Sequence, residues 1–176
     1  MSPSVLVFLD VDGTLLPFGA DRPYPVYEAA HPLPETATHP LLSRVDPALG
    51  DRLTELAALG CELVWATTWL DDANTCLAPW LGLPALPVVE WPDEGDEPRL
   101  GPRGLHWKTR PLAAWAARRP FVRVDDEITD ADRAWVAGHH RAPALLHRVD
   151  HRRGLTERDF AVLAEWVSAG GGPAAR

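Results

Sequence analysis

A run of apolar residues that ends in two closely spaced aspartates is the feature that most constrains how this chain can fold. The run covers Val5–Leu9, and Asp10, Asp12 and Gly13 follow it directly. An uninterrupted apolar segment of this length is typical of a strand buried on both faces of a parallel sheet. Such sheets bind ligands outside the carboxyl ends of their strands, although Asp and Gly also occur in ordinary turns. The choice between a ligand site and a turn depends on the rest of the sequence.

Strand-like and helix-like segments alternate along the chain after this run. We predict further strands at residues 62–67, 86–90, 121–125 and 144–148, and helices that begin near residues 47, 71, 108, 129 and 156. This alternation predicts an α/β fold, namely a single Rossmann-like, three-layer domain with a parallel sheet of about five strands. We expect the first strand at the centre of the sheet, between the second and the fourth. Residues 1–169 are expected to form this domain and residues 170–176 a flexible tail.

Two connections rich in proline separate these elements. The first, residues 16–44, contains six prolines, which exclude a long helix, so we expect an ordered loop or a small flap. The second, residues 92–104, is rich in Asp, Glu, Pro and Gly and is predicted to be a surface loop. Neither connection has the pattern of a folded cap domain.

Composition and charge limit where the protein acts and what it binds. No apolar run approaches the ~20 residues that span a membrane, and residues 1–4 lead into the first strand without the pattern of a secretory signal. The chain has two cysteines, so we expect no structural disulfide and a cytoplasmic location. The net charge of −8 does not favour binding of nucleic acid, which depends on Lys and Arg contacts. No pattern in the sequence predicts the oligomeric state.

Polar residues follow several of the predicted strands or open a helix. They favour a ligand site over an ordinary turn at the end of the first strand. They are Asp10, Asp12, Thr67, Lys108, Asp125 and Asp126. The carboxyl ends of strands in a right-handed doubly wound sheet gather at one edge, so these residues can meet. Converging carboxylates repel one another and need a cation, and hard oxygen ligands favour Mg²⁺. A lysine and a hydroxyl beside that cation could hold a phosphoryl group.

The same residues resemble the four motifs of the haloacid dehalogenase-like (HAD) hydrolase superfamily, in the family's order. The first motif, DxDGT, is similar to residues 10–14, and the second, a hydrophobic strand ending in Thr or Ser, to residues 63–67. Lys108 resembles the third motif, and the acidic pair Asp125 and Asp126 resembles the fourth. The resemblance covers residues 5 to about 148. Because no folded cap is expected, the chain looks like the capless members.

The resemblance implies a Mg²⁺-dependent phosphatase that hydrolyses a phosphomonoester through an aspartyl-phosphate intermediate. Asp10 would be the nucleophile. Asp12 would protonate the leaving group and then activate water; dehalogenases of the family lack an acid at this position. The implied metal ligands are the Asp10 carboxylate, the Asp12 backbone carbonyl and Asp125, with Asp126 either a further ligand or the holder of a metal-bound water.

The implied substrate-binding residues are Thr67 and Lys108, which would hold phosphoryl oxygens. Thr68 competes with Thr67, because a shift of one residue at the end of the strand exchanges them. Trp69 could offer an aromatic platform for the substrate, although an anchor for a loop on neighbouring apolar residues is the more common role of such a tryptophan. The partner is expected to be a phosphorylated small molecule, nucleotide or macromolecular end.

Two other functions stay open on the sequence alone. One is a phosphatase for nucleic-acid or nucleotide ends, which an uncapped site and local basic residues favour. The other is a binding or regulatory module without catalysis on the same fold. Substrate identity depends on loops, above all residues 16–44, whose conformation the sequence does not give.

Overall fold

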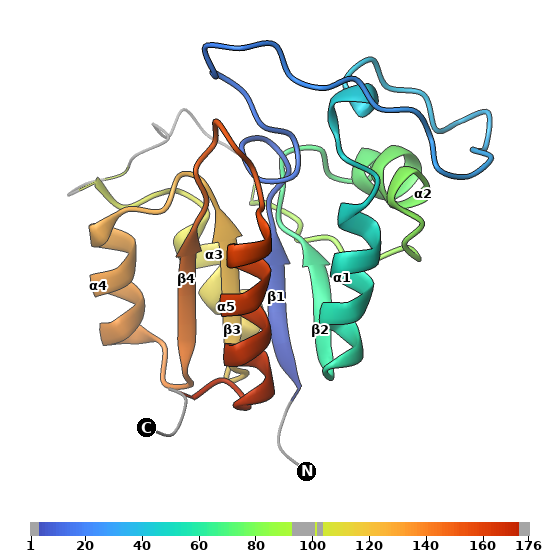
Figure 1. Ribbon diagram of the computed structural model, residues 1–176. Coiled ribbons are helices and arrows are strands. Elements are labelled where there is room, and N and C mark those ends of the chain that lie inside the picture. Colours follow the sequence, from blue (N-terminus) through green and yellow to red (C-terminus); the bar gives the residue numbers. More distant parts are fainter. Residues whose placement is uncertain (1–3, 93–100, 102–103, 173–176) are drawn as a thin grey trace.

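Helices cover both faces of one parallel sheet, which gives the molecule three layers (Figure 1). The computed structural model describes residues 4–92, 101 and 104–172. Its sheet has the strands β1 (Val5–Leu9), β2 (Cys61–Trp65), β3 (Phe121–Asp125) and β4 (Ala144–Arg148), in the order β2-β1-β3-β4. β1 therefore pairs with β2 on one side and with β3 on the other, as the sequence predicts.

The sheet of the described residues has four strands where about five were expected, because residues 86–90 form only a single bridge. Trp65 donates its N–H to the Pro87 carbonyl at 2.8 Å and accepts from Val89 at 2.9 Å. The preceding hydrogen bond of the ladder would require an amide hydrogen on Pro87, which proline lacks. At the next position the Thr67 carbonyl accepts from the indole N–H of Trp91. The segment therefore lies beside β2 without extending the ladder.

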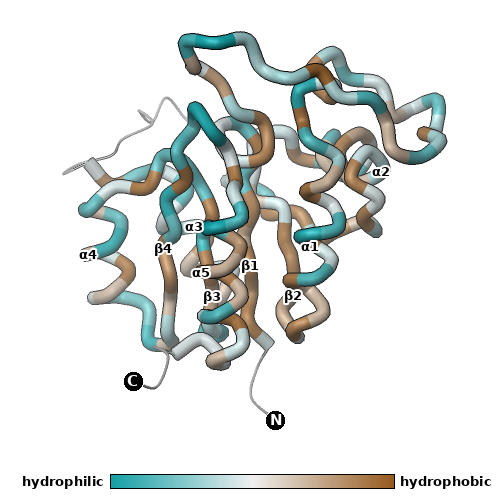
Figure 2. The backbone as a smooth tube through the Cα atoms, in the orientation of Figure 1, coloured by the Kyte–Doolittle hydropathy of each residue, from teal (hydrophilic) through white to brown (hydrophobic). Residues whose placement is uncertain are grey.

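Two helices cover each face of the sheet. α1 (Leu49–Ala58) and α5 (Glu157–Ser168) lie on one face, and α3 (Thr109–Ala116) and α4 (Asp130–His139) on the other (Figure 1). Alternate residues of β1 supply the two cores: Val7 and Leu9 belong to the first, Leu6 and Phe8 to the second. Figure 2 shows the hydrophobic colour that β1 and β2 carry as a result.

Short helical turns make up the remaining elements. They are η1 (Leu42–Arg44) and the π-helical turn η2 (Ala73–Leu77), which continues into α2 (Ala78–Leu81). Within the described ranges, no helix has both the length and the apolar character needed to cross a bilayer.

Helix ends differ from expectation where local hydrogen bonds intervene. α1 begins at Leu49 and not near residue 47, because the Asp46 carboxylate accepts from the Ala48 N–H and forms a turn before the helix. α3 ends at Ala116, since Ala117 has a positive φ of 55°. Two predicted helix starts are confirmed: Thr129 opens α4 and Thr156 opens α5, each as a capping box.

The connection over residues 16–44 passes over the carboxyl edge of the sheet, at the top of Figure 1. It contains no strand and no helix before η1, in agreement with the predicted ordered loop. The Phe18 N–H donates to the His151 carbonyl at 2.8 Å, and the Arg44 guanidinium donates to the Pro17 carbonyl at 2.6 Å. Most of the predicted surface loop at residues 92–104, and residues 173–176 of the predicted tail, lie outside the described residues.

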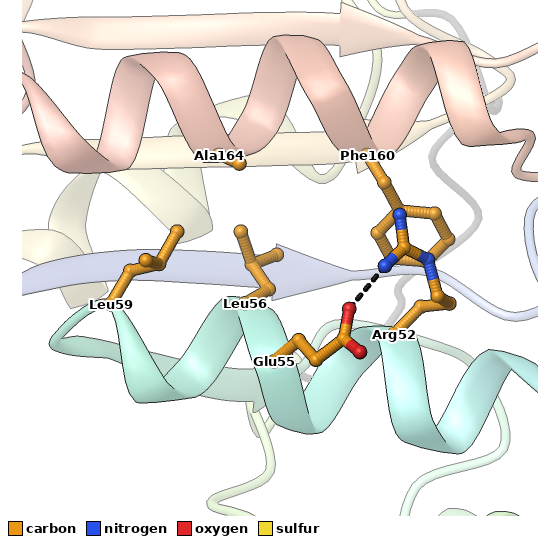
Figure 3. A pocket seen from close by; sticks show the side chains of 6 residues that line it. All are labelled: Arg52, Glu55, Leu56, Leu59, Phe160 and Ala164. Atoms are coloured by element: carbon orange, nitrogen blue, oxygen red, sulfur yellow. Dashed lines mark hydrogen bonds and ion pairs between the residues drawn. The ribbon is translucent and has the colours of Figure 1, made fainter.

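α1 and α5 leave a small groove between them (Figure 3). Its lining is formed by Arg52, Glu55, Leu56, Leu59, Phe160 and Ala164. The Arg52 guanidinium lies over the Phe160 ring at 5.4 Å and donates from Nε to Glu157 at 3.0 Å. These contacts join the two helices, and none of the predicted site residues lines the groove.

Candidate active site

Three buried carboxylates converge where β1 and β3 end. Asp10 follows β1, Asp125 ends β3 and Asp126 comes next, and one oxygen of each lies within 4.8 Å of the others. Their exposed fractions are 5%, 1% and 8%. The Asp10 N–H donates to the Val124 carbonyl at 3.1 Å, which joins the two strand ends. The parallel pairing of β1 with β3 thus brings together aspartates that are more than a hundred residues apart.

Gly13 makes the close approach of the first loop to this cluster possible. Its φ is +77°, a conformation that favours glycine. A Cβ at this position would overlap the carboxyl group of Asp126. The Gly13 N–H donates to the Leu16 carbonyl at 2.9 Å, so the loop folds back on itself directly after Asp12. The glycine of the first motif is therefore a steric requirement of the acidic cluster.

Lys108 provides a positive charge inside the cluster. Its Nζ lies 2.9 Å from Asp10 Oδ1 and 3.2 Å from Asp125 Oδ2, and the side chain is buried. Burial alone would lower the pKa of the ammonium group, but the two carboxylates raise it above its ordinary value. Lys108 immediately precedes α3, as the sequence predicts for a lysine at a helix start.

Arg123 is a buried partner of Asp125 that the sequence analysis missed. Its Nη2 and Nε donate to Asp125 Oδ2 at 3.0 and 3.2 Å, and Nη1 donates to Thr109 Oγ1 at 2.9 Å. Burial would raise the pKa of Asp125, but Arg123 and Lys108 together lower it to about 2. A signal was present, since an arginine in an otherwise apolar strand, two residues before an aspartate, lies on the same face of that strand.

The other two carboxylates have the opposite electrostatic environment. Burial, partly opposed by Lys108, raises the pKa of Asp10 to about 7. Burial and the neighbouring charge of Asp125 raise the pKa of Asp126 to about 6. In their ionised forms the three carboxylates would carry more negative charge than Lys108 and Arg123 offset. Three hard oxygen donors in this arrangement fit a divalent cation such as Mg²⁺.

The end of β2 contributes a second group of side chains. Thr67 is fully buried, and its Oγ1 accepts from the Trp69 N–H at 3.2 Å. Thr68 is exposed to solvent. The structure therefore places Thr67, and not Thr68, at the buried end of β2. The Trp69 indole N–H donates to Asp12 Oδ2 at 3.2 Å. Trp69 is thereby joined to both Asp12 and Thr67.

Two further tryptophans, also missed as site residues, lie beside Lys108. The Lys108 Nζ is 6.0 Å from the Trp91 ring and 5.8 Å from the Trp107 ring, and the two rings meet edge to face at 4.8 Å. Trp91 also donates its indole N–H to the Thr67 carbonyl at 3.0 Å. The sequence has eight tryptophans, and only the position of Trp107 next to Lys108 distinguishes either of these two.

The structure thus gathers the predicted residues at one edge of the sheet, with Thr68 alone turned to solvent. Asp10, Asp125, Asp126 and Lys108 form the buried centre, and Asp12, Thr67 and Trp69 lie at its side. The chemical roles of these residues remain predictions. Their arrangement places the two carboxylates of the first motif, Asp10 and Asp12, at the same edge of the sheet as the buried Lys108 ammonium group.

A family model described as "HAD domain in Swiss Army Knife RNA repair proteins" matches residues 6–160 of the chain. The matched segment contains the whole site. No curated protein and no solved structure matches the chain at a significant level.

Proposed function

The chain belongs to the family of HAD domains in Swiss Army Knife RNA repair proteins, and from this membership and the geometry of the site we propose that it is a Mg²⁺-dependent phosphatase. It hydrolyses a phosphomonoester through an aspartyl phosphate on Asp10. The observation that carries the proposal is the convergence of Asp10, Asp125 and Asp126 around the Lys108 ammonium group. Structural carboxylates are normally satisfied by the protein's own donors, whereas this cluster keeps an excess of negative charge.

Asp10 begins the reaction as the nucleophile. Its carboxylate oxygen forms a bond to phosphorus while the bond from phosphorus to the leaving oxygen breaks. Lys108, at 2.9 Å from Asp10 Oδ1, holds the attacking group and offsets the charge of the incoming phosphoryl group. Thr67 binds another phosphoryl oxygen through its hydroxyl group.

Asp12 transfers the protons. It gives a proton to the leaving oxygen in the first step and takes one from water in the second, when water attacks the aspartyl phosphate. The products are the alcohol and inorganic phosphate, and Asp10 is regenerated.

Mg²⁺ would be held by the Asp10 carboxylate, the Asp12 backbone carbonyl, Asp125 and Asp126, and it would supply the positive charge that the cluster lacks. Arg123 fixes Asp125 in the ionised form that a ligand requires. Asp125 is therefore the proposed ligand whose ionised form the protein stabilises most.

The family description supports the phosphorylated end of an RNA as the substrate. A large substrate is also favoured because the described residues form no folded cap domain over the carboxyl edge of the sheet, where only the 16–44 connection passes. The net charge of −8 does not favour extensive backbone contacts. Recognition of the end by a few local contacts agrees with both observations.

The test is the release of inorganic phosphate with Mg²⁺ from an aryl phosphate, a phosphorylated sugar and RNA oligonucleotides carrying a 5′- or a 3′-phosphate. We expect turnover of the aryl ester and a higher kcat/KM for one of the RNA ends. Asp10→Asn serves as the blank for contaminating phosphatases. Absence of Asp10-dependent turnover on every ester would exclude the enzymatic function, whereas preference for the sugar phosphate would exclude only the RNA substrate.

A further inference from the structure

Trp69 connects three parts of the molecule that are distant in sequence. Its indole N–H donates to Asp12 Oδ2 at 3.2 Å, and its backbone N–H donates to Thr67 Oγ1 at 3.2 Å. Its ring also packs against His39, with ring centroids 4.2 Å apart and an interplanar angle of 41°. Trp69 is thus in contact with the proposed acid–base group, the proposed phosphoryl-binding hydroxyl and the 16–44 connection.

We propose that Trp69 is a positioning residue that holds Asp12 in the orientation from which it protonates the leaving group. The proposal rests on the proposed function, because it assigns a role to Asp12 in that reaction. Lys108 is engaged by Asp10 and Asp125, so the hydrogen bond that orients Asp12 comes from Trp69. Asp12 is only partly buried, and an unrestrained carboxylate there would be free to rotate toward solvent.

The contact also distinguishes the two oxygens of Asp12. An indole N–H can only donate a hydrogen bond, so it marks Oδ2 as an acceptor. Oδ1 is then the oxygen that carries the transferred proton. Trp69 therefore defines which oxygen faces the leaving group.

The backbone of Trp69 orders the neighbouring hydroxyl in the same way. A threonine hydroxyl has one hydrogen to donate and two lone pairs. Because Thr67 Oγ1 accepts from the Trp69 N–H, its own hydrogen is directed elsewhere and can be donated to a phosphoryl oxygen. One residue thus prepares both the proton donor and the phosphoryl-binding donor.

His39 extends this arrangement into the loop above the sheet. Its Nδ1 accepts from the Leu41 N–H at 3.2 Å, which fixes the ring in the plane that meets Trp69. His39 lies in the 16–44 connection, so the loop supports the indole and, through it, Asp12. A substrate platform is the competing role for Trp69, and it would act on binding and not on proton transfer.

Trp69→Phe is the variant that separates these roles, since it removes the N–H and keeps an aromatic ring against His39. A hydrogen bond to a charged group contributes about 1.5–3 kcal/mol, so we expect kcat/KM, which reports the step in which the leaving group departs, to fall about 10–100-fold on an alkyl phosphate. The kcat/KM on p-nitrophenyl phosphate should change less than about 3-fold, because its leaving group needs little protonation. KM should be nearly unchanged on both esters.

Two further variants sharpen the test. Adding Trp69→Phe to Asp12→Asn should cause no additional loss on the alkyl ester, because the two residues act as a unit. His39→Ala should reproduce the same dependence on leaving group with a smaller loss, and it provides the comparison if Trp69→Phe does not fold. Trp115→Phe is the matched control: Trp115 is 37% exposed, packs on Phe8 and belongs to α3, and its replacement should leave both activities unchanged.

The results that overturn the inference differ from those that overturn the proposed function. Equal losses on both esters, a rise in KM alone, or full additivity with Asp12→Asn would each show that Trp69 does not act through Asp12. Absence of turnover by the wild-type protein on both esters would instead contradict the proposed phosphatase function.

Discussion

Asp10 and Asp126, which follow β1 and β3, differ from the capping carboxylates at the starts of α4 and α5 in how many donors surround them. Asp132, in the capping box of α4, accepts from the His106 N–H at 2.8 Å and the Thr109 hydroxyl at 2.7 Å through Oδ1. Its Oδ2 accepts from the N–H and the hydroxyl of Thr129, at 2.7 and 2.9 Å. Both oxygens are satisfied by the protein.

The pKa values of the two kinds of carboxylate differ accordingly: a carboxylate with more donors has the lower pKa. Burial alone would raise the pKa of Asp132, but the hydrogen bonds from Thr109, Thr129 and His106 lower it below its ordinary value. The pKa of Asp10 is raised to about 7 by burial, which Lys108 opposes only in part. The protein's own donors thus satisfy the structural carboxylates, whereas Asp10 and Asp126 have too little positive charge nearby to offset their burial. This shortage separates the candidate site, for which we propose an external cation and an anionic substrate, from an equally buried structural cluster.

The largest effect is expected from Asp10→Asn. The replacement removes the nucleophile, so turnover should fall below detection, while relief of repulsion with Asp125 and Asp126 should keep the metal-free protein at least as stable as the wild type. Phosphate release and thermal unfolding in EDTA measure the two effects. Asp159→Asn is the matched control from a capping box and should show the reverse, namely retained activity and reduced stability. Turnover that survives in Asp10→Asn would contradict the assignment of the nucleophile.

Removal of the metal should also abolish activity. We expect no phosphate release in EDTA and full recovery on addition of Mg²⁺. Mg²⁺ at about 100 times its Kd should stabilise the fold by about 2.7 kcal/mol, which a shift of the unfolding midpoint measures. Asp125→Asn and Asp126→Asn should reduce that shift. If the midpoint were insensitive to Mg²⁺ in the wild type, the acidic cluster would not be a metal site.

Asp12→Asn should reduce turnover without abolishing it. The loss of kcat/KM on alkyl phosphates should be ~10²–10⁴-fold, the usual contribution of general acid–base catalysis, and smaller on aryl phosphates. Hydrolysis of the aspartyl phosphate should slow, so acid quench should trap more of it than in the wild type. An equal loss on both classes of ester would argue against proton transfer by Asp12.

The structural carboxylates should affect stability in proportion to their burial. Asp132→Ala leaves several buried donors unpaired and should lower the free energy of unfolding by about 3 kcal/mol. Asp159→Ala removes a more exposed cap and should lower it by about 1 kcal/mol. Urea unfolding at neutral pH measures both. A larger loss of unfolding free energy for Asp159→Ala than for Asp132→Ala would contradict the expected dependence of stability on burial.

The smallest effect concerns the pH dependence of stability. The pKa values of Asp132 and Asp159 are lowered in the folded state, so their contribution is fully present above the unfolded value of about 4. It is lost as the pH falls through the folded values. Urea unfolding between pH 6 and pH 3 should therefore show a shallower decline for Asp132→Ala than for the wild type. Parallel declines would show that Asp132 does not contribute to the acid sensitivity.

Much of the fold could be predicted because its determinants are local. The apolar runs give the bounds of β1, β3 and β4 as the structure has them, and the two capping boxes follow from Thr and Asp at a spacing of three. The predicted strand at residues 86–90 does not form, because Pro87 has no amide hydrogen with which to continue the ladder beside β2. That outcome depends on which residue of β2 lies opposite, and the sequence does not give this register.

The candidate site could be predicted in its acidic centre but not in its supporting contacts. Asp10 and Asp125 follow strands whose ends meet in any doubly wound sheet of this order. The hydrogen bond from Trp69 to Asp12 joins residues 57 positions apart and depends on the rotamers of both side chains. Trp91 and Trp107 likewise reach Lys108 only through the path of loops without a periodic pattern.

The position of β1 in the sheet has a consequence for how the protein acquires its site. β1 pairs only with segments far along the chain, since Val5 lies opposite Cys61 and Leu6 opposite Phe121. Loop closure over such separations slows folding. Asp10 and Asp125 meet only when β1 pairs with β3, so a collapsed species without this pairing would lack the proposed metal site. Binding of Mg²⁺ during refolding would therefore report the completion of the β1–β3 pair, and a chain on the ribosome would acquire the site only after residue 125 has left the exit tunnel.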